Sequence, residues 1–200
     1  MNISRRIYLP LILTLFSAIA GVLVYQGAGT TTVILVRHAE KIDDSANPSL
    51  SPEGLMRAES LVQAVEAYEI DGMYSTNFCR TALTVQPLAL ALALPIHIQK
   101  ISARGGFKAC NPVLEVALKN LPAELNDEAA FKNYLLEKHA GETVLVVGHS
   151  NTTPSLVNAL GAGAFDVPQL DHEAYDDVFV VTLNRDTVKL TSTTYTDLVK

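Results

Sequence analysis

Hydrophobic and polar positions fall into alternating blocks along this chain, and the blocks predict strands and helices in turn. Two blocks rich in β-branched residues, 32–36 and 143–147, are apolar almost throughout, which is typical of strands buried on both faces of a sheet. Shorter or alternating patterns predict four further strands, at residues 72–75, 96–101, 178–183 and 187–193. The last two enclose a polar tripeptide and therefore predict a hairpin.

Helical spacing of apolar residues separates most of these strands. Ser51-Pro52-Glu53 offers an N-cap, a proline at the first helical position and an early acid, so we expect a helix from there to about Tyr68. Helices are also expected over residues 77–92, 127–139 and 154–160, with Pro87 kinking or shortening the first of them. Strands that alternate with helices favour a three-layer α/β/α sandwich around a mostly parallel central sheet.

The first 28 residues differ in character from the rest. Arg5 and Arg6 precede an uncharged run, residues 7–25, whose middle resembles the apolar region of a signal peptide and contains the small-residue pattern Ala18-Ile19-Ala20. The run is also long enough to span a bilayer uncleaved, so a signal peptide and an N-terminal anchor both stay open. In either case the positive-inside rule places the remaining domain, residues 29–200, outside the cytoplasm. Membrane contact is then expected only through residues 7–25, and only if they are uncleaved.

Charge and cysteine content narrow the possible partners. The chain has a net charge of −6, and it contains no basic stripe or run of Lys and Arg, which argues against a nucleic-acid partner. An acidic protein can still bind an anion where a few cations converge in one cleft. The two cysteines, Cys79 and Cys110, suit an exported chain; a disulfide between them and simple burial of Cys79 both stay open.

The candidate chemistry lies where the predicted strands end. Arg37-His38-Ala39-Glu40 follows one apolar strand, Gly148-His149-Ser150 follows another, and the strand ending at Ser75 leads to Arg80-Thr81. Parallel sheets collect ligand groups beyond the carboxyl ends of their strands. Guanidinium groups match the geometry of phosphate oxygens, and a neutral imidazole is a nucleophile at neutral pH.

With these motifs the sequence resembles the histidine phosphatase superfamily, the phosphoglycerate-mutase-like group, over nearly all of residues 32–195. The resemblance implies a phosphoglycerate-mutase-like fold. It also implies that the protein hydrolyses small phosphorylated substrates without a metal or another cofactor. It implies that His38 attacks phosphorus to form a phosphohistidine, which water then hydrolyses. It also implies that the phosphoryl oxygens are bound by Arg37, Arg80, protonated His149 and Ser150.

One part of the family pattern is missing, namely the general acid. Many members supply a Glu or Asp after the second arginine, but no acidic residue occurs between Arg80 and Glu115. A branch that places Asp directly after its second histidine is excluded, because Ser150 stands there. The remaining candidates are Glu115, Glu40 and the acidic cluster from Asp171 to Asp177, in which Glu173 is favoured. A poorly placed acid favours substrates whose leaving group needs little protonation, and it argues against a mutase.

Three other functions compete with this one. The residues from Gly148 to Thr152 lack the second glycine of the G-x-S-x-G elbow found in α/β-hydrolases. A zinc enzyme finds no support, since neither H-E-x-x-H nor C-x-x-C occurs. The alternative that stays open is a catalytically weak or inactive phospholigand-binding domain. Such a domain would bind phosphate through its arginine residues but would not hydrolyse the ligand.

Overall fold

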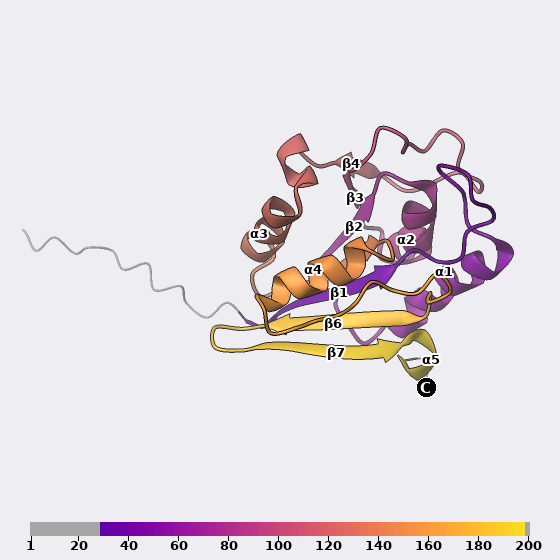
Figure 1. Ribbon diagram of the computed structural model, residues 1–200. Coiled ribbons are helices and arrows are strands. Elements are labelled where there is room, and N and C mark those ends of the chain that lie inside the picture. Colours follow the sequence, from indigo (N-terminus) through magenta and orange to yellow (C-terminus); the bar gives the residue numbers. More distant parts are fainter. Residues whose placement is uncertain (1–28, 199–200) are drawn as a thin grey trace, which may run out of the picture.

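A seven-stranded sheet with helices on both faces forms the body of the protein in the computed structural model, which describes residues 29–198 (Figure 1). The strand order is β4-β3-β2-β5-β1-β6-β7. The strands are β1 Thr31–Arg37, β2 Gly72–Thr76, β3 Ile96–Gln99, β4 Leu118–Asn120, β5 Thr143–Gly148, β6 Asp177–Leu183 and β7 Val188–Thr194. The helices are α1 Pro52–Ala64, α2 Cys79–Leu92, α3 Glu128–Lys138, α4 Thr152–Gly161 and α5 Tyr195–Leu198, with a 3₁₀ turn at Ala123–Asn126.

The sheet is mostly parallel, as the strand–helix alternation predicts. Strands β4, β3, β2, β5 and β1 run parallel to one another, whereas β6 pairs antiparallel with β1 and forms the predicted hairpin with β7. The three-layer α/β sandwich is therefore confirmed. Because the five parallel strands end at the same edge, the loops that follow β1, β2 and β5 emerge together.

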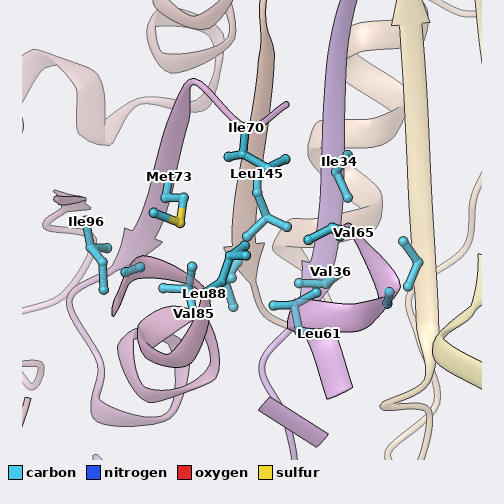
Figure 2. Close-up of a cluster of buried hydrophobic side chains, with 14 of the residues drawn as sticks. Ile34, Val36, Leu61, Val65, Ile70, Met73, Val85, Leu88, Ile96 and Leu145 are labelled. Atoms are coloured by element: carbon cyan, nitrogen blue, oxygen red, sulfur yellow. The ribbon is translucent and has the colours of Figure 1, made fainter. Parts of the chain in front are cut away.

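Each face of the sheet has its own hydrophobic core. On one face, side chains such as Ile34 and Val36 of β1 pack against α1 and α2 through residues that include Leu61 and Val85 (Figure 2). On the other face, Val33 and Leu35 point toward α3 and α4, and every residue of β1 is buried. The period-two alternation of strand side chains thus supplies both cores from a single apolar block.

Some observed elements differ from those predicted. Helix α1 ends at Ala64 instead of Tyr68. Helix α2 continues past Pro87 to Leu92, the end predicted for it, so Pro87 does not shorten it; the buried residues around the proline, among them Val85 and Leu88, pack in the core and outweigh its local preference. Strand β4 lies in a stretch predicted to be irregular, and it makes β3 an inner strand.

The N-terminal prediction falls outside the described residues. The expected signal peptide or anchor lies in residues 1–28, which the structure does not describe. Among residues 29–198, no helix combines the length and apolarity needed to cross a membrane.

A disulfide joins Cys79, at the start of α2, to Cys110 in the loop before β4. Both residues belong to a small third cluster that also contains Ala39 and Leu83. The bond therefore ties the long loop to the part of the core that lies against the chain just after β1.

We expect replacement of both cysteines by alanine to lower the free energy of unfolding. The bond closes a loop with a sequence separation of 31 residues, for which loop entropy in the unfolded chain predicts a loss of about 4 kcal/mol. Urea denaturation without reductant measures this loss. The unmodified protein under reducing conditions is the control and should lose a similar amount; equal midpoints for variant and oxidised protein would contradict the prediction.

Candidate active site

A pocket of about 420 Å³ lies beyond the carboxyl ends of β1, β2 and β5. The pairing register explains its position, because Arg37 lies opposite Gly148 and Ser75 opposite Val147. The backbone N–H of His38 donates to the carbonyl of Gly148 at 3.0 Å and extends the β1–β5 ladder by one bond. The pocket is lined by Arg37, His38, Lys41, Ser45, Ala46, Pro48, Phe78, Arg80, Ile101, Ser102, His149, Ser150, Asn151, Thr152 and His172.

His38 is held as a neutral imidazole with one nitrogen left to react. Its Nδ1 lies 2.8 Å from the carbonyl oxygen of Ala39, and since a carbonyl only accepts, Nδ1 carries the proton. Burial, with a contribution from the arginine charges, lowers the pKa of His38 to about 2. The lone pair of Nε2 is therefore present at neutral pH. The N–H of Ala39 donates to Thr84 Oγ1 at 2.9 Å, which fixes this loop to α2.

His149 lies beside His38, with ring centroids 5.4 Å apart. Arg80 Nη2 approaches His149 Nδ1 at 3.4 Å and can only donate, so the proton of His149 is on Nε2 and is donated to Thr76 Oγ1 at 2.9 Å. Burial first, and then the charge of Arg80, lowers the pKa of His149 to about 3. These contacts favour a neutral ring, which differs from the protonated form that the resemblance implies. A phosphoryl dianion beside the ring would raise this pKa, because an opposite charge favours the charged form.

The guanidinium of Arg37 binds backbone carbonyls through one nitrogen and leaves another without a partner among the described residues. Its Nη1 donates to the carbonyl oxygens of Asp171, His172 and Ala174 at 2.8, 3.0 and 3.1 Å, and its central carbon lies 4.0 Å from the ring centroid of Tyr175. Its Nε is buried and has no hydrogen-bond partner among the described residues. Buried donors are normally satisfied, so Nε is available for an acceptor such as a phosphoryl oxygen.

Arg80 supplies the second guanidinium of the pocket. Its central carbon lies 4.4 Å from the ring centroid of Phe78, and both residues line the pocket from the start of α2. Burial and, to a lesser extent, the nearby charge of Arg37 lower the pKa of Arg80, which stays far above neutral in any protein. Two cations that converge in one pocket favour a multiply charged anion.

The carboxylates predicted as general acids do not line this pocket. Arg57 pairs with Glu40 at 2.6 Å and with Asp176 at 2.8 Å. Burial disfavours ionisation of Glu40, but the hydrogen bonds and charge of Arg57 outweigh it and lower the pKa, which makes Glu40 a poor proton donor. Glu115 is bound through its backbone N–H to Gln86, and Glu173 bonds to His172, which does line the pocket.

The structure brings five residues of the predicted site to one pocket, namely His38, His149, Arg37, Arg80 and Ser150. Sequence reasoning did not foresee the positioning contacts of Thr84 and Tyr175 or the place of His172. In the sequence, Thr84 differs in no way from other residues of its helix, and His172 lies within the acidic cluster, whose carboxylates are its most evident feature. Among residues 29–198, no group of three or more His, Cys, Asp or Glu side chains has an arrangement that could hold a metal ion.

Residues 33–101 match the family model described as histidine phosphatase superfamily, branch 1. Over these residues the chain is similar to the histidine phosphatase superfamily, branch 1. The sequence has no match among curated proteins.

Solved structures agree with this histidine phosphatase fold. The protein histidine phosphatase SixA complexed with tungstate is 19% identical and covers 84% of this chain and 99% of its own, with a TM-score of 0.60. An ecdysone phosphate phosphatase from Bombix mori, also with tungstate, is 14% identical over 82% of this chain and 92% of its own, with a TM-score of 0.57. A phosphoserine phosphatase mutant from Entamoeba histolytica, in complex with phosphoserine, is 16% identical. It covers 85% of this chain and 100% of its own, with a TM-score of 0.52. At these identities the likeness shows the fold.

We expect Arg80→Ala to weaken binding of phosphate and vanadate to this domain. The change removes one of the two guanidinium groups of the pocket, and loss of a hydrogen bond to a charged group corresponds to roughly a tenfold or greater rise in the dissociation constant. Calorimetric titration of both anions measures it. Arg104→Ala, at an exposed arginine outside the pocket, is the matched control. Unchanged affinity in Arg80→Ala would remove Arg80 from the site.

Proposed function

We propose that this domain hydrolyses phosphomonoesters without a metal ion, through a phosphohistidine on His38. The observation that carries the proposal is the state of this one side chain. Its Nδ1 proton is engaged by the carbonyl of Ala39, so the lone pair of Nε2 remains for attack in a pocket that contains two guanidinium groups.

The surrounding groups suit the charge of a transferring phosphoryl group. Such a group carries negative charge on three oxygens, so catalysis depends on positioning and electrostatic stabilisation. Arg37 and Arg80 would bind these oxygens from two sides, with the unpaired Nε of Arg37 as one donor. His149 would take up a proton as the dianion binds and so add a third charged donor. Ser150, at the pocket wall, would contribute a hydroxyl group.

The absence of a carboxylic acid from the pocket lining bears on the substrate. Phosphoryl transfer to His38 is easiest from a leaving group that is stable without a proton, such as an aryl oxygen or a ring nitrogen. The name of the similar SixA, a protein histidine phosphatase, suits a nitrogen leaving group. The same absence also favours the second candidate, a phospholigand-binding domain that does not turn over.

Hydrolysis of p-nitrophenyl phosphate in excess EDTA tests the proposal and separates the two candidates. Its leaving group is good, so a missing acid should not hide activity. We expect turnover in EDTA, and a fall of at least about 1,000-fold in His38→Ala, since loss of the nucleophile removes the covalent route.

His97→Ala is the matched control for this experiment, because His97 lies on β3 outside the pocket. Circular dichroism would check that each variant keeps its fold. Substantial activity in His38→Ala would refute the phosphohistidine mechanism. A folded wild-type protein that binds phosphate without turnover would instead identify a binding domain.

We also propose that the domain works outside the cytoplasm, in the periplasm or secreted, or held at the membrane by its N-terminal segment. Two observations support this: the uncharged run at residues 7–25 behind two arginines, and the Cys79–Cys110 disulfide. Disulfides form and persist in oxidising compartments and are rare in the cytosol.

Thiol alkylation in the producing cell tests this location. The full chain should resist alkylation until it is reduced, because its two cysteines are paired after export. A chain that lacks residues 1–28 should remain in the reducing cytoplasm and react at both thiols. Prompt alkylation of the full chain at Cys79 and Cys110, as seen by gel shift, would count against export.

A further inference from the structure

The proposed reaction leaves one proton unassigned. When the bond from phosphorus to the leaving oxygen breaks, that oxygen needs a proton, and no Asp or Glu among residues 29–198 lines the pocket. Beyond His38, His149 and the two arginines, the lining contains two titratable side chains, Lys41 and His172. Lys41 forms an ion pair with Asp44 on the loop that follows β1. This leaves the imidazole of His172.

We propose that His172 is the general acid of this site, oriented by Glu173, an assignment that rests on the proposed phosphatase function. It replaces the carboxylic acid that many relatives supply after the second arginine. An imidazole exchanges protons near neutral pH and is the side chain most often used as a general acid.

The backbone of His172 is tied to the phosphate-binding groups. Its carbonyl oxygen accepts from Arg37 Nη1, and so do the carbonyls of its neighbours Asp171 and Ala174. The N–H of Leu170 donates to the carbonyl of Ser150 at 2.9 Å, which joins the start of the segment to the loop after His149. The position of His172 is therefore set by the same residues that would hold the phosphoryl group.

The side chain lies on the outer side of the pocket. His38 is 5% exposed and His149 8%, whereas the side chain of His172 is 70% exposed. Attack and departure are roughly in line in phosphoryl transfer, so a leaving group points away from the buried nucleophile. It would then emerge on the exposed side of the pocket, to which His172 belongs.

Glu173 determines which nitrogen of His172 exchanges the proton. Glu173 Oε1 lies 2.8 Å from His172 Nδ1, and since an ionised carboxylate only accepts, Nδ1 keeps its hydrogen. Nε2 is left to donate when the ring is protonated and to accept when it is neutral. Glu173 is thus a positioning residue, in the manner of the carboxylate that orients a catalytic histidine in hydrolytic triads.

The two steps balance with this one group. In the first, the lone pair of His38 Nε2 forms the bond to phosphorus, the bond to the leaving oxygen breaks, and that oxygen takes the Nε2 proton of His172 and departs as an alcohol. In the second, a water oxygen attacks phosphorus and gives a proton to neutral His172. The P–N bond then breaks, and its electron pair returns to His38.

The dependence of rate on the leaving group tests the assignment in the full-length protein. kcat/KM is measured for p-nitrophenyl phosphate, phenyl phosphate and glycerol 2-phosphate, whose leaving groups become progressively poorer. We expect His172→Gln to lose about 100-fold on glycerol 2-phosphate, the size of a general-acid contribution. Its loss on p-nitrophenyl phosphate should be at least 10 times smaller. Glu173→Gln should show the same trend with a smaller loss on glycerol 2-phosphate.

His97→Gln is the matched control, the same substitution at a histidine of β3 outside the pocket, and should keep the wild-type dependence on the leaving group. Equal losses of His172→Gln on all three substrates, or no loss on any, would overturn the assignment while leaving the phosphatase function intact. A folded wild-type protein that hydrolyses none of the three would overturn both.

Discussion

The parallel pairing of β1 with β5 is the constraint on which the candidate site depends. Arg37 lies opposite Gly148, and the bond from the His38 N–H to the Gly148 carbonyl continues the ladder beyond the strands, so the two histidines leave the sheet side by side. Both strands are buried on both faces, and a slip of one residue would exchange every side chain between the two cores. The apolar packing of the sheet therefore sets the 5.4 Å separation of the two imidazole rings.

Burial then determines the charge of the site. It lowers the pKa of His38 to about 2 and that of His149 to about 3, so both rings are neutral and the local positive charge belongs to Arg37 and Arg80. Two guanidinium groups in one pocket repel each other, and this repulsion is offset by carbonyl oxygens around Arg37 and by the faces of Tyr175 and Phe78. A chain with a net charge of −6 thus presents a cationic pocket at one edge of its sheet.

The parts of the fold that sequence reasoning predicted are those with a local cause. The blocks at 32–36 and 143–147 correspond to β1 and β5 because an apolar run of that length fits a buried strand. The candidate residues Arg37, His38 and His149 could be named from the sequence because they lie at or just after the ends of these two strands. Strand β4 escaped prediction, since two of its three residues are exposed and pairing with β3 holds it. The ion pair of Glu40 could not be predicted from the sequence either. Its partner Arg57 is 17 positions away, and Asp176, which binds the same arginine, is 119 positions from Arg57. No local pattern reports such contacts.

The divided guanidinium of Arg37 shows how phosphate binding and the 171–174 segment can share one residue without competing. The three carbonyls of the segment all bind Nη1, so anchoring the segment leaves the buried Nε without a partner. An unsatisfied buried donor costs about 1–3 kcal/mol, a free energy that a phosphoryl oxygen would recover on binding. Because the carbonyls stay bound meanwhile, the segment would keep its place while the anion occupies the pocket. The outer wall of the pocket would thus be positioned before the substrate arrives, which spares the reaction the entropy of ordering that wall.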